Sequence, residues 1–170
     1  MALEIERKFL VTGEGWREAA HAVLPMAQGY LNDIGAMDRG EQHASIRVRI
    51  QGGEAFLNIK SREIGRSRQE FDYPVPVDDA RALLALCVGG VIDKRRHLVR
   101  HEGHVWEVDE FLGDNAGLVV AEIELGSPDE AFALPPWAGR EVTDEPRYYN
   151  LALASRPYSR WIAAERGDQD

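Results

Sequence analysis

Charged residues recur at every second position in several stretches that are predicted to be β-strands, and this pattern constrains the fold more than any other feature. In the first of these stretches, Glu4, Glu6 and Lys8 share one face of the strand, and Ile5 and Phe9 share the other. Unpaired charge is unfavourable in a dry core. A single stretch of this kind would indicate a strand with one solvated face. Its recurrence along the chain indicates that many strands direct their charged faces to one place.

Eight strands are expected, and most of them follow one another through short turns. They span residues 3–11, 27–33, 45–50, 56–62, 68–75, 91–100, 101–111 and 118–126, and Gly52-Gly53 forms a two-residue hairpin turn. Helices are expected over 16–23, from Asp78 to the Gly89-Gly90 pair, over 127–134 and in the tail from about 146, with a loop over 34–43.

The charged faces of these strands contain both acids and bases. The acids are Glu4, Glu6, Glu70, Asp72, Glu107, Asp109, Glu122 and Glu124, and the bases are Lys8, Arg47, Arg49, Lys60, Arg62, Lys94 and Arg96. The opposite faces are largely apolar, as at Ile46, Val48 and Ile50. We therefore predict a single α+β domain over residues 1–170. Its centre is an eight-stranded antiparallel barrel with a charged lumen and helices packed on the outside. The C-terminal helix either plugs one end of the barrel or covers its wall.

Composition excludes several classes of protein. The chain of 170 residues has a formal net charge of −9, which disfavours nucleic acids and anionic membranes as partners. No apolar run reaches the length of a membrane span. The single cysteine, Cys87, permits no internal disulfide, and a cytoplasmic location is expected. The sequence leaves the oligomeric state open, with a homodimer as one option.

The spacing of the charged residues indicates a ligand. Acids and bases in one lumen could simply pair, but buried ion pairs add little net stability. Glu4 and Glu6, like Glu122 and Glu124, direct two carboxylates to one place, as a hard divalent cation requires. The guanidinium groups of an R-x-R pair match phosphate oxygens. Together these features favour a metal-bound polyphosphate.

The ordered set of motifs resembles the CYTH superfamily, or triphosphate tunnel metalloenzymes. The resemblance rests on E-x-E-x-K at Glu4–Lys8, R-x-R at Arg47 and Arg49, Lys60, Glu70, the pair Lys94 and Arg96, Asp109, E-x-E at Glu122 and Glu124, and the closing segments Glu141–Thr143 and Tyr148–Asn150. The resemblance spans nearly the whole chain. Within the superfamily, the chain resembles the short, stand-alone inorganic triphosphatases.

The resemblance implies an eight-stranded tunnel that binds a linear triphosphate with Mg²⁺ or Mn²⁺. The residues expected to hold phosphate oxygens are Lys8, Arg47, Arg49, Lys60, Lys94 and Arg96. The residues expected to hold one or two metal ions are Glu4, Glu6, Glu70, Asp109, Glu122 and Glu124. Glu4, Glu6, Lys8 and Lys94 are expected to be catalytic. Arg62, Asp72 and Glu107 lie near predicted strand ends and are not counted in the site.

Three functions are consistent with this reading. The first is metal-dependent hydrolysis of inorganic triphosphate to pyrophosphate and phosphate. The second is that of a class IV adenylyl cyclase or a nucleoside or thiamine triphosphatase, which would share the tunnel. The third is a non-catalytic polyphosphate-binding module. The acids in the lumen argue against the third, because an anion alone does not require them.

Overall fold

A computed structural model of the chain describes residues 2–62 and 67–167. The strands are β1 (Ala2–Val11), β2 (Ala20–Tyr30), β3 (Ala44–Gln51), β4 (Glu54–Ser61), β5 (Ser67–Val75), β6 (Val88–His101), β7 (His104–Phe111), β8 (Val119–Glu124) and β9 (Ala138–Glu141). The α-helices are α1 (Gly15–Ala19), α2 (Ile34–Asp38), α3 (Val77–Leu84), α4 (Asn150–Ser155) and α5 (Ala163–Arg166). Short 3₁₀ turns are η1 (Gly113–Asn115), η2 (Pro146–Tyr148) and η3 (Tyr158–Arg160).

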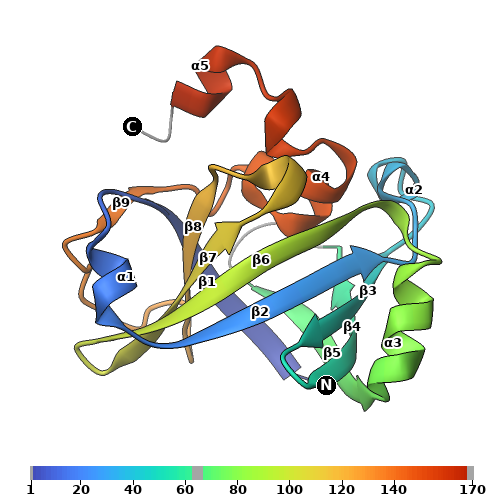
Figure 1. Cartoon of the computed structure of the whole chain (residues 1–170), viewed down its shortest axis with the longest axis horizontal. Helices are drawn as coiled ribbons and strands as arrows, with labels where there is room; N and C mark the ends of the chain where they lie inside the picture. Colours follow the sequence, from blue (N-terminus) through green and yellow to red (C-terminus); the bar gives the residue numbers. More distant parts are fainter. Residues whose placement is uncertain (1, 63–66, 168–170) are drawn as a thin grey trace.

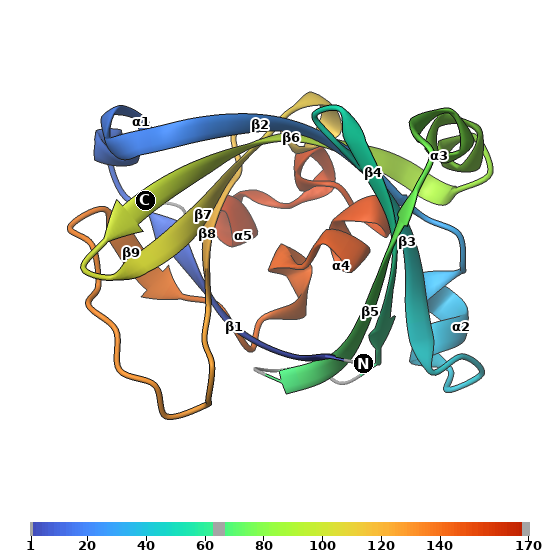
Figure 2. The same cartoon turned by 90° about the horizontal axis from the view of Figure 1, so that it is seen from below.

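Strands β1 to β8 form a closed antiparallel barrel, which confirms the predicted fold (Figures 1 and 2). The strand order is β5-β4-β3-β2-β6-β7-β8-β1, and pairing of β5 with β1 closes the ring. Strand β9 adds to the end of β1, where Phe9 lies opposite Glu141. Closure leaves the long strands without free edges, so their alternating side chains divide between a lumen and an outer wall.

The lumen changes from charged to apolar toward one end. Along β1, Leu10 continues the phase of Lys8, is only 2% exposed, and packs in a core cluster with Ile92 and Val120. Leu153 of α4 completes that cluster from the C-terminal segment. Figure 2 shows α4 across the barrel when the molecule is seen from below. Of the two alternatives left open by the sequence, the C-terminal helix therefore closes one end of the barrel.

Helix α3 packs on the outer wall, as predicted for the helices. Its Ala80 is fully buried against Val48 of β3 and Ala55 of β4. Val48 is out of phase with Arg47 and Arg49, so burial of Val48 under α3 directs both arginines to the lumen.

The helix predicted over 16–23 is wrong in its second half. Helix α1 ends at Ala19, and β2 runs from Ala20, so this strand also begins earlier than the predicted 27–33. Ala20 to Tyr30 pair with β6 on one side, and the end of the strand pairs with β3 on the other. These cross-strand contacts override a helical spacing of apolar residues that extended over only two turns.

Two further predictions are corrected. The expected loop over 34–43 contains α2, which begins at the N-cap Asp33, whose carboxylate accepts from the Gly35 N–H at 3.0 Å. The helix predicted over 127–134 is absent, and that segment forms a turn followed by chain without regular secondary structure. Here Glu130 accepts from the Gly126 N–H at 2.8 Å and contacts His104, so its carboxylate fastens the turn to the barrel. No helix in the described part of the chain has the length and apolar character needed to cross a membrane.

Candidate functional site

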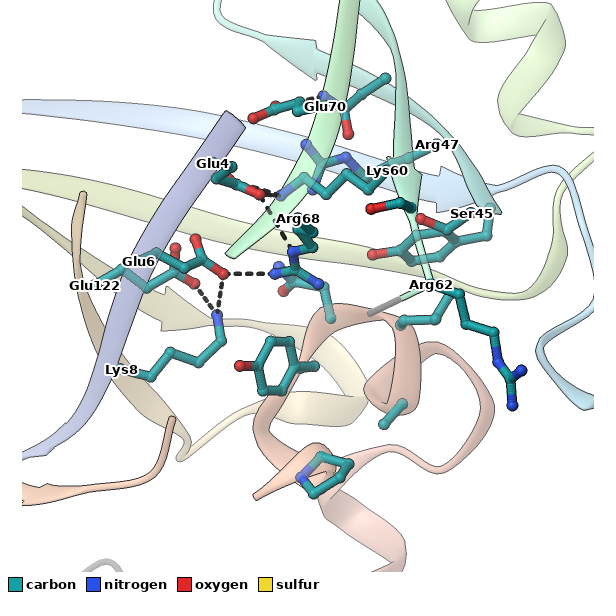
Figure 3. A pocket seen from close by; sticks show the side chains of 18 of the residues that line it. Glu4, Glu6, Lys8, Ser45, Arg47, Lys60, Arg62, Arg68, Glu70 and Glu122 are labelled. Carbon is teal, nitrogen blue, oxygen red and sulfur yellow. Dashed lines mark hydrogen bonds and ion pairs between the residues drawn. The ribbon is translucent and has the colours of Figure 1, made fainter. Parts of the chain in front are cut away.

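The lumen contains a cavity of about 390 Å³ whose wall carries most of the predicted site residues (Figure 3). The predicted residues in its wall are Glu4, Glu6, Lys8, Arg47, Arg49, Lys60, Glu70, Arg96, Glu122 and Glu124. Lys94 and Asp109 lie behind this wall, fully buried against Arg96. Strand alternation therefore brings residues from distant parts of the sequence to one place, as predicted.

Strand register sets opposite charges side by side in parts of the lumen. Lys8 lies opposite Glu122, and its ammonium forms an ion pair with that carboxylate. Glu122 and Glu6 raise the pKa of Lys8 although burial opposes the shift. Lys60 lies opposite Glu70 but reaches across to Glu4 at 2.9 Å (Figure 3). Such pairs hold the charged side chains in fixed positions.

Elsewhere the register sets acids against acids. Glu6 lies opposite Glu124, and Glu107 lies opposite Glu122. Burial raises the pKa of Glu124, and so do the neighbouring carboxylates of Glu4, Glu107, Glu70 and Glu6. Within the described residues, Glu124 has no ion-pair partner. We call Glu4, Glu6, Glu70, Glu107 and Glu124 the acid cluster. Their mutual repulsion makes this a favourable place for an added cation.

Arg47 and Arg49 of β3 are cations of the lumen wall, and Arg47 is buried whereas Arg49 is partly buried. Arg47 is 5% exposed, and its buried Nε has no hydrogen-bond partner. The Nε of Arg49 donates to Gln28 at 3.1 Å. Burial lowers the pKa of Arg49, and the charges of Arg47 and Arg96 lower it further. In the part of the chain that the structure describes, neither arginine forms an ion pair with a carboxylate, so this guanidinium pair favours an anion.

Lys94 and Arg96 share the carboxylate of Asp109. Lys94 Nζ lies 2.7 Å from Oδ2, and Arg96 donates to both carboxylate oxygens at 2.8 and 2.9 Å. Burial opposes ionisation of Asp109, but Arg96 and Lys94 lower its pKa to about 2. Burial also lowers the pKa of Lys94 to about 7. The charge of Asp109 opposes this shift, whereas the positive charges of Arg96 and Arg49 add to it. Both oxygens of Asp109 thus have cationic partners, and its predicted metal role stays a prediction.

Arg68 of β5 is a site residue that the sequence analysis missed. Its Nη2 donates to Glu6 at 2.6 Å and its Nε donates to Glu4 at 3.3 Å (Figure 3). Strand alternation does predict a lumen position for Arg68, because it lies on the same face of β5 as Glu70 and Asp72. Glu107 and Arg62, which were not counted in the site, also line the cavity. Residues of the tail do so as well, among them Tyr149 and Asn150, and strand periodicity could not reveal these.

The predicted metal ligands are close to cations rather than gathered around one point. Among the described residues, no group of three or more acidic, histidine or cysteine side chains is arranged to hold an ion. Glu4, Glu6 and Glu122 are each bound to a lysine or an arginine. The metal site therefore stays a prediction that rests on the chemistry of the acid cluster.

Comparison with known proteins identifies the family. The CYTH domain profile matches residues 2–156. An inorganic triphosphatase from Acetivibrio thermocellus is 44% identical over 159 residues, which cover 93% of this chain and 97% of that protein. An inorganic triphosphatase from Nitrosomonas europaea is 40% identical over 154 residues, covering 89% and 96%.

Solved structures agree with this assignment. The crystal structure of an inorganic triphosphatase matches with a TM-score of 0.63 and 35% identity, and the match covers 91% of this chain and 95% of that chain. A putative adenylyl cyclase from Hippeastrum has a TM-score of 0.58 over 74% of this chain and 81% of its own, but its 16% identity shows a shared fold alone. The chain therefore belongs to the CYTH domain family.

Proposed function

We propose that this protein hydrolyses inorganic triphosphate to pyrophosphate and phosphate inside the barrel. The observation that carries the proposal is the pair of guanidiniums at Arg47 and Arg49, which lack carboxylate partners among the described residues and share one cavity with the acid cluster. Full-length similarity to proteins named inorganic triphosphatases supports the same reaction.

The basic residues bind and orient the substrate in this proposal. Arg47 and Arg49 donate to phosphate oxygens, because an anion offsets the burial and the repulsion that lower the pKa of Arg49. Burial and the charge of Arg47 lower the pKa of Lys60, so Lys60 also gains from a bound anion. Arg96, held by Asp109, and Arg68, held by Glu4 and Glu6, complete a ring of fixed cations.

The acid cluster fits a divalent cation. It offers only carboxylate oxygens, the ligands that Mg²⁺ and Mn²⁺ prefer, and burial together with the neighbouring carboxylates raises the pKa of Glu124. Glu124, Glu4, Glu6 and Glu70 would hold the ion, with Glu122 beside them. When bound, such an ion neutralises phosphate charge and lowers the pKa of a bound water molecule.

Lys8 and Lys94 act on the charge that develops during hydrolysis. Lys8 is buried and permanently cationic, so it stabilises negative charge on the phosphate oxygens without reorganisation. Lys94 has a pKa of about 7 and can exchange a proton near neutral pH. Glu4 and Glu6 also position Arg68, in addition to their predicted role as metal ligands.

We also propose a cytoplasmic setting with a small-molecule substrate and no nucleic-acid or membrane partner. The net charge of −9 and the single cysteine support this setting.

The test is to measure phosphate and pyrophosphate released from tripolyphosphate, ATP and thiamine triphosphate, with Mg²⁺, Mn²⁺ or excess chelator. We expect equal amounts of phosphate and pyrophosphate from tripolyphosphate, and no turnover in chelator. Tight binding of tripolyphosphate without release would indicate a binding module. Preferred turnover of ATP or thiamine triphosphate would indicate an organic substrate, and turnover in chelator would contradict the metal role.

A further inference from the structure

The aromatic ring of Tyr149 lies against two cations of the site that come from different strands. Lys8 Nζ lies 4.6 Å from the ring centroid, and the Arg68 guanidinium carbon lies 5.2 Å from it. Tyr149 belongs to the C-terminal segment, whereas Lys8 is on β1 and Arg68 is on β5. The ring also lines the cavity. One side chain therefore connects the closed end of the barrel with both cations.

We propose that Tyr149 is a positioning residue for the reaction, whose ring holds Lys8 and Arg68 in the geometry that the substrate requires. This inference rests on the proposed triphosphatase function. It concerns a residue outside the E-x-E-x-K and R-x-R motifs, and it gives the C-terminal segment a part in the chemistry beyond closing the barrel.

The ring is itself held in place by a short chain of hydrogen bonds. Its hydroxyl donates to the carbonyl oxygen of Thr143 at 2.5 Å. The Thr143 hydroxyl oxygen accepts from the backbone N–H of Lys8 at 3.0 Å, and the Lys8 carbonyl accepts from the N–H of Val142 at 2.9 Å. Segment 142–149 thus holds the backbone of Lys8 on one side and its ammonium on the other.

The two cations share a carboxylate, so their positions depend on one another. Glu6 lies 2.6 Å from Arg68 Nη2 and 3.6 Å from Lys8 Nζ (Figure 3). A shift of either cation would move Glu6, which is a predicted metal ligand and catalytic residue. Loss of the ring would therefore disturb both the phosphate-binding and the acidic parts of the site.

The inference requires the π-face of the ring rather than its hydroxyl. A cation over an aromatic face is stabilised by the ring quadrupole, most strongly where water is largely excluded. Lys8 is 2% exposed, and the Arg68 side chain is 14% exposed, so both contacts are largely dry. Phenylalanine at position 149 keeps the π-face, whereas leucine keeps the bulk and loses the quadrupole.

The first test compares Tyr149→Phe, Tyr149→Leu and a matched control, Tyr73→Leu, because Tyr73 is 54% exposed on β5. We expect kcat for tripolyphosphate to stay within about twofold for Tyr149→Phe and to fall about tenfold or more for Tyr149→Leu. If Tyr149→Leu retains full activity, or if Tyr149→Phe loses as much as Tyr149→Leu, the inference is overturned. Tyr149→Met replaces the leucine variant if that protein does not fold.

The second test does not depend on activity. A double-mutant cycle of Tyr149→Leu and Arg68→Met, measured by urea unfolding, isolates the contact between the two side chains. We expect the effects on the unfolding equilibrium constant to be non-additive by about threefold or more. Additive effects would overturn the inference. An inactive wild-type protein would refute the proposed function, while this cycle would still decide whether the ring holds the cation.

Discussion

Glu6 on β1 and Glu124 on β8 lie directly opposite each other in the antiparallel register, with both strand phases directed to the lumen. Two carboxylates in this relationship repel each other, and a fold selected for stability alone would not favour them. Glu6 is compensated by Arg68 and Lys8, whereas Glu124 has no ion-pair partner in the described part of the chain. The negative charge that lacks a cationic partner is therefore concentrated on Glu124, at the proposed metal site.

Glu124→Gln should make the protein slightly more stable and abolish its metal-dependent turnover. The pKa of Glu124 is raised in the folded state, so the stability that its protonated form confers is present at low pH and is lost as the pH rises through the raised value. Glutamine resembles the protonated form. We expect a gain below about 1 kcal/mol at pH 7, because the residue is exposed and its charge is screened by solvent, together with loss of metal-dependent turnover. Thermal unfolding and phosphate release measure the two effects.

The control for this variant is Glu54→Gln, at an exposed carboxylate on β4 next to the hairpin turn. It should change neither Tm nor turnover. A lower Tm for Glu124→Gln than for this control would show that Glu124 stabilises the fold, contrary to our account.

Arg49→Ala should weaken substrate capture without destabilising the protein. The guanidinium is partly buried, its pKa is lowered by burial and by Arg47, and its side chain donates only to Gln28 among the described residues. Loss of one charge-assisted contact to phosphate is worth about 1.5–3 kcal/mol, so KM should rise about tenfold to a hundredfold. Steady-state kinetics with tripolyphosphate test this, and Arg100→Ala, at an exposed position of β6, is the matched control. An unchanged KM would remove Arg49 from the anion site.

Lys94 should make triphosphate binding depend on pH near neutrality. Burial lowers its pKa to about 7, so the ammonium form is present below that pH and is lost as the pH rises through it. We expect affinity for tripolyphosphate, measured by calorimetry without metal between pH 6 and 8.5, to weaken with rising pH. Lys94→Arg stays charged throughout and corrects for protonation of the ligand itself. Parallel curves for the two proteins would exclude titration of Lys94.

The lowered pKa of Lys94 also determines the direction in which stability changes with pH. Because the pKa of Lys94 is lower in the folded than in the unfolded state, the unfolded chain binds more protons between pH 7 and 10. This lysine should therefore make the protein more stable as the pH rises across that range.

Leu153→Ala should show that α4 is part of the core. Leu153 is 1% exposed in the apolar end of the lumen, where it packs with Leu10 and Val120. Removing a buried leucine side chain typically destabilises a protein by about 2–5 kcal/mol. Urea unfolding should report a loss in this range, and Leu134→Ala, at a residue that is 57% exposed, should report little change. Equal effects of the two substitutions would mean that the C-terminal helix is not packed as described.

Strand phase was sufficient to predict the barrel and most of the lumen, because it is a local property of the sequence. Arg47 and Arg49 were placed correctly by alternation with Val48, whose burial under α3 fixes the direction. The same rule applied to β5 would have added Arg68, which shares the phase of Glu70.

The remaining features depend on tertiary contacts that local patterns do not contain. The capping-box pattern at 127–130 predicts a helix, but Glu130 is instead held by His104 and the Gly126 N–H. Tyr149 reaches Lys8 only because the tail folds back and closes one end of the barrel. Which charges pair and which remain unpaired depends on strand register, as the contrast between Lys8 opposite Glu122 and Glu6 opposite Glu124 shows.

The central claim is that one lumen holds a triphosphate on its guanidinium groups and a divalent cation on its acid cluster. The most direct measurement is a crystal structure of the wild-type protein grown with tripolyphosphate and Mn²⁺ under conditions that slow turnover. We predict phosphate density beside Arg47 and Arg49 and an anomalous manganese peak beside Glu124. Ordered tripolyphosphate or manganese bound only outside the lumen would contradict the account.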